Sequence, residues 1–98
     1  MQLNISYKVI ILTKKDKLLK RFLSKPKDLT WDEYAKVFAY FGFELKAGNG
    51  SRRSFVDDNS NIFHIHEPHP SSIMKPYTIK LAIEWLTEQG YIKDNDNE

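Results

Sequence analysis

Apolar side chains recur at helical spacing along much of the chain, which predicts helices. The first helical segment spans residues 14–24, where an apolar stripe is followed by Pro26, a residue that ends helices. The second starts at Thr30 and stops at Gly42. Thr30 and Glu33, three residues apart, match the capping-box pattern of a helix start, and a glycine is typical of a helix end.

The remainder of the chain combines a third helical segment with three short strand-like segments. The helix is expected to start at Pro76, because proline suits the first helical position, and to end at Gly90. Segments rich in glycine, asparagine and aspartate separate the strands, as turns do. The expected strands are residues 43–46, 51–57 and 62–66.

The element order α-α-β-β-β-α predicts an α+β fold with a three-stranded antiparallel sheet. Helices packed on one face of the sheet would cover its apolar side and leave the other face open. We expect a single domain over residues 14–92, an N-terminal extension at 1–13 and a flexible acidic tail at 93–98. The alternating pattern of Met1–Leu12 fits either a short edge strand or a loosely packed extension.

Composition narrows the class of protein. A chain of 98 residues with 41% hydrophobic and 29% charged residues is typical of one small globular domain. The absence of cysteine excludes disulfides and thiolate chemistry. The longest apolar run, Val9–Leu12, is too short for a membrane span, and the N-terminus lacks a secretory signal pattern. We therefore expect a cytoplasmic protein with no membrane association.

Charge is unevenly distributed, although the net charge is only +2. Between Lys14 and Lys27 there are seven basic residues against the single acidic residue Asp16, a local charge of 7 − 1 = +6. Such a stretch permits a polyanionic partner, and it is equally compatible with a solvated helix face.

The three histidines all fall between positions 64 and 69. Strand alternation places Arg52 on the same face as Ser54, and His64 on the same face as His66. If Phe63 packs under the helices, these groups meet on the open face, and His69 lies on the loop just beyond.

This grouping suits cleavage of RNA. The ribose 2′-hydroxyl must lose a proton and the leaving 5′-oxygen must gain one, and imidazole can do either near neutral pH. A guanidinium or ammonium group can bind the phosphate and stabilise the charge that builds on it. The candidate catalytic residues are His66, Arg52, His64 and His69, and the candidate RNA-binding residues are Ser51, Arg53, Lys75 and Lys46.

Other interpretations of the same residues stay open. Histidines on an exposed strand are often only solvated polar residues. A zinc site formed by His64, His66 and His69 is a further alternative, but its only neighbouring carboxylate is Glu67. We expect neither a metal nor another cofactor. Tyr77, Trp85 and Tyr91 can be interpreted as base-stacking residues, but their positions around a helix favour packing.

Several short motifs, taken in order, resemble HicA-family toxins. Gly50-Ser51-Arg52 resembles the Gly-Ser-His entry to the second strand of that family. His64-Ile-His-Glu-Pro-His-Pro70, followed by Ser72-Ile-Met-Lys75, resembles its Pro-x-His loop and last helix. The segments Leu18–Pro26 and Thr30–Glu33 resemble a subgroup with an extra N-terminal helix, so the resemblance covers residues 14–92.

The resemblance implies a fold similar to a double-stranded-RNA-binding domain and the function of a toxin that cleaves mRNA without a metal. It also implies a HicB-type antitoxin that covers the active face. The catalytic histidine of typical members falls at position 52, where this chain has arginine, a poor base. Either catalysis moves to His66 or His64, or the protein binds RNA without cutting it. A protein-interaction domain that uses the open face is the third possibility.

Overall fold

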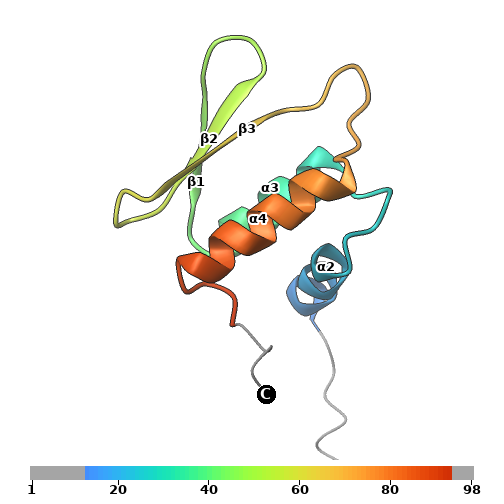
Figure 1. Cartoon of the computed structure of the whole chain (residues 1–98), viewed down its shortest axis with the longest axis vertical. Helices are drawn as coiled ribbons and strands as arrows, with labels where there is room; N and C mark the ends of the chain where they lie inside the picture. Colours follow the sequence, from blue (N-terminus) through green and yellow to red (C-terminus); the bar gives the residue numbers. More distant parts are fainter. Residues whose placement is uncertain (1–12, 94–98) are drawn as a thin grey trace, which may run out of the picture.

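The computed structural model describes residues 13–93, and its elements follow the predicted order (Figure 1). Three sequence predictions lie outside the described residues: the edge strand within residues 1–12, the N-terminal extension except for Thr13, and the acidic tail except for Lys93. The elements are α2 (Lys14–Leu23), α3 (Trp31–Tyr40), β1 (Glu44–Ala47), β2 (Arg52–Val56), β3 (Ile62–His66) and α4 (Pro76–Glu88). Within residues 13–93 there is no helix of the length and hydropathy that crossing a membrane requires.

The strands form an antiparallel sheet in the order β1-β2-β3, which confirms the predicted meander. Helices α3 and α4 cover one face of this sheet, and α2 packs against them on the side away from the sheet (Figure 1). The α+β fold class is therefore confirmed, with α3 to α4 in the order α-β-β-β-α of a double-stranded-RNA-binding domain. The second face of the sheet is left uncovered by the described helices.

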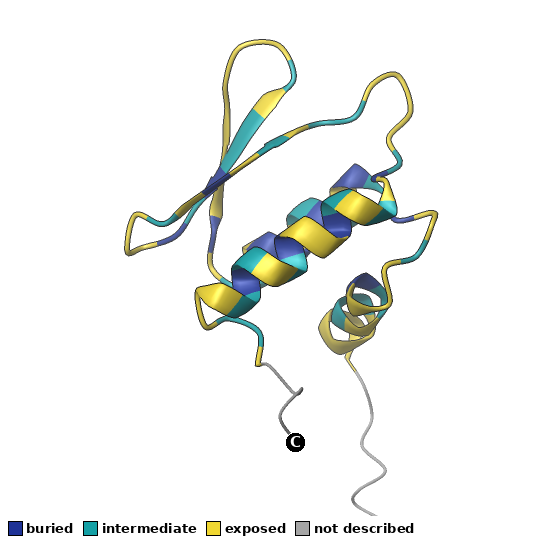
Figure 2. Cartoon of the chain, in the orientation of Figure 1, coloured by how far each residue is buried: buried dark blue, intermediate teal, exposed yellow. Residues whose placement is uncertain are grey.

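Aromatic rings fill the space between the sheet and the helices. Phe38 of α3 stacks on Phe55 of β2 with ring centroids 4.2 Å apart and an interplanar angle of 8°. Its ring also lies 5.3 Å from Phe63 of β3 and 5.2 Å from Phe43. Figure 2 shows the buried positions concentrated between the sheet and the helices. Burial of such large apolar side chains is the main favourable contribution to folding.

Tyrosines link the elements around this core. Tyr34 is fully buried, which raises the pKa of its phenol far above the usual value, and its hydroxyl donates to the Thr78 carbonyl 3.0 Å away. The predicted packing of Trp85 is confirmed by its contacts with two core phenylalanines. The packing predicted for Tyr77 is wrong: its side chain lies on the outer face of α4 and is 63% exposed.

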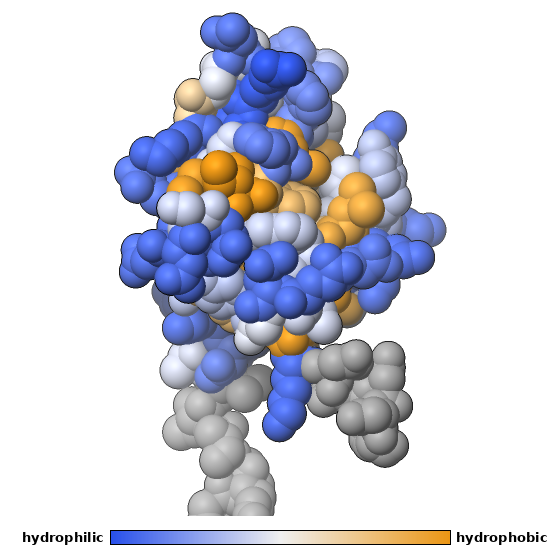
Figure 3. Space-filling model, turned by 60° about the vertical axis from the view of Figure 1, so that its left-hand side comes forward, coloured by the Kyte–Doolittle hydropathy of each residue, from blue (hydrophilic) through white to orange (hydrophobic). Residues whose placement is uncertain are grey.

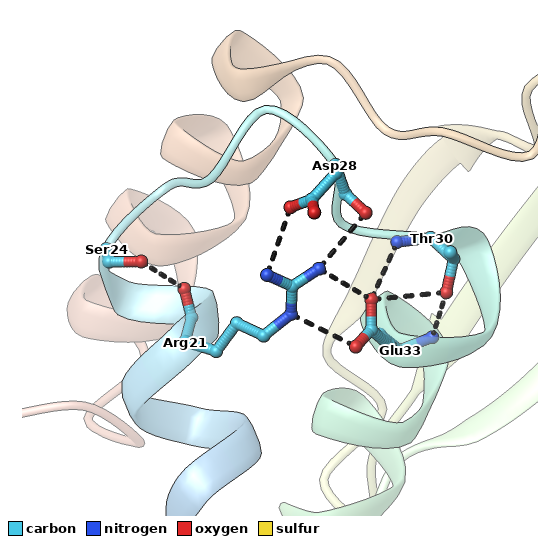
Figure 4. Close-up of polar contacts among 5 residues, drawn as sticks. All are labelled: Arg21, Ser24, Asp28, Thr30 and Glu33. Carbon is cyan, nitrogen blue, oxygen red and sulfur yellow. Dashed lines mark hydrogen bonds and ion pairs between the residues drawn. The ribbon is translucent and has the colours of Figure 1, made fainter.

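Helix α3 begins with the predicted capping box, and the same glutamate also holds α2. The Thr30 hydroxyl accepts from the Glu33 N–H, while the Glu33 carboxylate accepts from the Thr30 N–H. Arg21 of α2 donates to both carboxylate oxygens of Glu33 at 3.1 and 3.2 Å, and it pairs with Asp28 (Figure 4). The hydrogen bonds from Arg21 lower the pKa of Glu33. The residues that start α3 therefore also fix the position of α2.

Asp57, at the turn after β2, ties the C-terminal segment to the sheet. The Tyr91 hydroxyl donates to its carboxylate at 2.6 Å, and the backbone N–H groups of Asn59 and Asn61 donate at 2.9 and 2.8 Å. Desolvation of this buried carboxylate opposes its ionisation, but these hydrogen bonds outweigh desolvation and lower the pKa of Asp57 to about 2. The bond to Asp57 in turn raises the pKa of Tyr91 to about 12.

We expect Tyr91→Phe to lower the free energy of unfolding at neutral pH and to flatten its dependence on pH. The folded-state pKa of Asp57 lies below the ordinary 3.8, so its contribution is present above that pH and is lost as the pH falls toward 2. The pKa of Tyr91 lies above the ordinary 10.0, so its contribution is present below that pH and is lost as the pH rises through 12. Urea denaturation across these pH ranges measures both effects.

The control is Tyr77→Phe, which removes a hydroxyl that makes no hydrogen bond within residues 13–93. Its stability curve should follow that of the wild type at every pH. Superimposable wild-type and Tyr91→Phe curves would show that the Asp57–Tyr91 contact does not stabilise the fold.

Candidate active site on the open sheet face

The open face of the sheet brings Arg52, His64 and His66 together, as strand alternation predicts. Arg52 lies opposite His66, and Ser54 lies opposite His64, in the register of β2 and β3. Phe55 and Phe63 point the other way and are buried under the helices. These open-face side chains border a depression of about 720 Å³. Its lining residues are Gly48, Asn49, Arg52, Arg53, Ser54, His64, Ile65 and His66.

Each of the two strand histidines is held by a serine. The Ser51 hydroxyl lies 3.0 Å from Nδ1 of His66, and the Ser54 hydroxyl lies 2.9 Å from Nδ1 of His64. Neither Nε2 atom takes part in a hydrogen bond within residues 13–93. Both imidazoles are exposed and lie two residues apart on one strand, a spacing of about 7 Å along the backbone. Two oriented rings on one surface can therefore act on two atoms of one bound substrate.

Arg52 reaches this face past a glycine. Gly48 donates its N–H to the Arg52 carbonyl at 2.8 Å. A Cβ atom at position 48 would lie only 3.2 Å from the Arg52 Cβ, closer than side-chain carbons normally approach. Gly48 thus leaves room for the Arg52 side chain at the rim of the depression. Arg52 is exposed and makes no ion pair within residues 13–93, so its guanidinium can bind a phosphate.

Arg53 has a different environment from Arg52. It points to the helix side, and its guanidinium pairs with Glu67 at 2.9 Å. It also donates to the Gly50 and Arg52 carbonyls at 2.9 and 2.7 Å. These contacts tie the β1–β2 turn to the segment after β3, and so they position the chain on either side of Ser51.

The other candidate residues lie apart from the depression or at its margin. His69 is exposed and lines a separate hollow of about 420 Å³ with Ser51, Arg53 and Glu67. Lys46 is opposite Ser54 on the open face, and its ammonium lies 3.7 Å from the Glu44 carboxylate. Lys75 is exposed at the start of α4 and lines neither hollow. The catalytic role of His69 and the RNA-binding roles of Lys46 and Lys75 stay predictions.

The structure also bears on the basic stretch and on the zinc alternative. The basic stretch at residues 14–27 lies on and after α2, behind the helices and away from the sheet (Figure 1). It therefore does not extend the charge of the open face. The zinc alternative has no ligand set in the described part of the chain, because no three His, Cys, Asp or Glu side chains group there as metal ligands would.

Ser54 is the residue that the sequence reasoning left out of the site. Alternation placed it on the correct face, but its contact with His64 depends on the cross-strand register. The contact between Ser51 and His66 has a different origin: His66 lies opposite Arg52 in the register, and Ser51 reaches its ring from the position just before β2. A serine directly opposite a histidine on facing strands is therefore a signal for the Ser54–His64 pair alone.

Comparison with protein families gives a match to the segment that holds the sheet. A family described as the HicA toxin of bacterial toxin–antitoxin systems matches residues 31–86, more than half of the 98 residues. The match begins at the first residue of α3 and ends within α4, so α2 lies outside it. Neither a curated protein nor a solved structure matches the chain significantly.

Proposed function

Because the chain belongs to the HicA toxin family of toxin–antitoxin systems, we propose that it acts as a ribonuclease on mRNA in the cytoplasm. The observation that supports this proposal is the joint presence of His64, His66 and Arg52 around one open depression. The depression lies on an exposed face of the sheet, which suits a polymer that must be approached from the side. Of its two arginines, Arg53 is paired with Glu67, whereas Arg52 makes no ion pair within residues 13–93 and supplies the cation that binding to a phosphodiester requires.

The proposed reaction is an attack of the 2′-hydroxyl on the adjacent phosphorus. Nε2 of His66 accepts the hydroxyl proton, while its Nδ1–H donates to the Ser51 hydroxyl and holds the ring. The bond between O2′ and phosphorus forms as the bond to O5′ breaks. His64 donates a proton from Nε2 to O5′, so the products are a 2′,3′-cyclic phosphate and a 5′-hydroxyl end.

Arg52 stabilises the transition state in this scheme. Its guanidinium lies opposite His66, where it can donate two parallel hydrogen bonds to the phosphate oxygens. Charge on those oxygens grows as phosphorus becomes five-coordinate, so the contact strengthens in the transition state. An arginine at position 52 thus supplies electrostatic stabilisation in place of a proton acceptor. The two proton transfers are carried out by His66 and His64 of β3. No step requires a metal ion.

Incubation of the purified protein with RNA in EDTA tests the function. We expect cleavage products with cyclic phosphate ends, and Arg52→Ala should lower the cleavage rate by about 10²–10³-fold, as loss of one transition-state donor does. Arg52→Lys should restore part of this loss, because lysine keeps the charge but not the two parallel donors.

The control is Lys36→Ala, which removes a cation from the exposed surface of α3, away from the open face of the sheet. RNA binding without cleavage by the wild type would refute the nuclease and favour an RNA-binding module. An affinity for RNA that does not fall with added salt would exclude phosphate contacts altogether.

A further inference from the structure

The outer edge of β3 is unpaired in the described part of the chain, and a groove runs between it and α4. The sheet ends at β3, since its order is β1-β2-β3. The groove has a volume of about 270 Å³. It is lined on the strand side by Phe63, His64 and Ile65, and on the helix side by Leu81, Glu84, Trp85 and Glu88.

The hydrogen-bond pattern shows which backbone groups face this edge. The Glu67 N–H donates to the Ser51 carbonyl and the Asp57 N–H to the Asn61 carbonyl, so both ends of the β2–β3 ladder are hydrogen-bonded pairs. Pairing alternates along an antiparallel ladder. Phe63 and Ile65 therefore bond to β2, while the backbone groups of Ile62, His64 and His66 point outward. An open row of this kind is a template for another strand.

The side chains around the edge define what can occupy it. Leu81 is 48% exposed and Ile62 is 45% exposed, on opposite sides of the strand edge. Figure 3, which turns the sheet side of the molecule toward the viewer, shows patches of apolar surface among hydrophilic side chains. Glu84 and Glu88 are exposed at the groove and make no ion pair within residues 13–93. The groove therefore suits an extended segment that carries apolar and basic side chains.

The acidic charge of the groove disfavours both RNA and a second copy of this chain as the occupant of this edge. RNA phosphates would be repelled by Glu84 and Glu88. A second copy of this chain would bring the same two carboxylates to the contact, where like charges would oppose pairing. A protein partner with lysine or arginine at the matching positions has neither difficulty.

We propose that the antitoxin partner of this toxin adds an extended segment along β3 as a fourth strand. Its apolar side chains pack on Leu81 and Ile65, and its basic side chains pair with Glu84 and Glu88. His64 lines both the groove and the open-face depression. Side chains on the other face of the added strand lie beside His64 and His66 and exclude RNA. This blocking effect rests on the proposed nuclease function, whereas the docking itself does not.

The first test measures the affinity of the full chain for the protein encoded by the adjacent reading frame, by titration calorimetry. Leu81→Asp should weaken binding about tenfold or more, as loss of about 1.4 kcal/mol implies. The double variant Glu84→Lys/Glu88→Lys should do the same by reversing the charge. Leu23→Asp is the matched control, because Leu23 is an exposed leucine of α2, on the side of the helices away from the sheet. Equal affinities for Leu81→Asp and Leu23→Asp would overturn the proposal.

Amide hydrogen exchange of the labelled full chain tests the strand pairing directly. The amides of Ile62, His64 and His66 should exchange rapidly in the free chain and become protected when the antitoxin binds. Those of Phe63 and Ile65 should be protected in both states. Protection of the outward amides in the free chain would mean that its own residues or a second copy occupy the edge, and would overturn the proposal. So would a complex in which these amides stay unprotected.

The two proposals can fail separately. Leu81→Asp should cleave RNA like the wild type but resist neutralisation by the antitoxin. If the wild type does not cleave RNA, the nuclease proposal fails, and the affinity and exchange measurements still decide whether the antitoxin docks on β3.

Discussion

Replacement of His66 by alanine is expected to slow RNA cleavage by about 10²–10⁴-fold, the usual contribution of a general base. His66 lies opposite Arg52 and lines the depression, and the Ser51 hydroxyl contacts its Nδ1, which leaves Nε2 without a hydrogen bond within residues 13–93. Alanine removes the proposed proton acceptor but leaves in place the guanidinium that we propose binds the phosphate. The affinity for RNA should therefore change little. Single-turnover cleavage rates and fluorescence anisotropy measure the two quantities on the same RNA.

His69→Ala is the matched control for this variant. It removes the same side chain from an exposed loop position in the neighbouring hollow, outside the shared depression. Its effect on the cleavage rate should be far smaller. An equal loss in both variants would move the proton acceptor to the loop, and an unchanged rate in His66→Ala would remove His66 from the mechanism.

The second large effect concerns stability. Phe38→Ala is expected to lower the free energy of unfolding by about 3–5 kcal/mol, because it leaves a cavity among aromatic rings. Phe38 is fully buried and stacks on Phe55, and its ring also lies beside Phe43 and Phe63. Such a loss is a large part of the roughly 5–15 kcal/mol that stabilises a typical domain. Urea denaturation followed by tryptophan fluorescence measures it.

Phe41→Ala provides the comparison for Phe38. Phe41 follows α3, is only partly buried and has Tyr91 as a neighbouring ring at 5.7 Å. Its removal should cost clearly less, since part of its surface already faces water. A loss of less than about 1 kcal/mol for Phe38→Ala, the average for point mutations, would contradict the role of Phe38 as the centre of the core.

The sequence predicted most of the fold because several independent signals agreed at each element. The capping box at Thr30 and Glu33 set the start of α3, and Gly42 adopts the positive φ of +91° that a glycine after a helix permits. The strand predicted at residues 62–66 has the same bounds in β3. β1 starts one residue later than expected, at Glu44, because Phe43 is bonded to the end of α3 and buried.

Details of the site needed information that alternation does not contain. Alternation assigns a face to each side chain, and on this basis Arg52, His64 and His66 were grouped correctly. It does not give the cross-strand partner, so the contact of Ser54 with His64 and the pairing of Arg53 with Glu67 emerged only from the register and the turns. The position of His69 depends on a loop, whose course no periodic pattern determines. Helical spacing likewise could not show that Tyr77 faces outward.

Helix α2 determines how far the chain can be shortened from its N-terminal side. The segment that matches the family begins at Trp31, yet Phe22 of α2 is fully buried against Tyr34, and Arg21 holds the glutamate that starts α3. A chain that lacked α2 would expose an aromatic ring and leave Glu33 without its cation in the same step. The matched segment is therefore not a self-sufficient folding unit in this protein, and a chain shortened to begin at Trp31 is expected to be less stable than one that keeps α2.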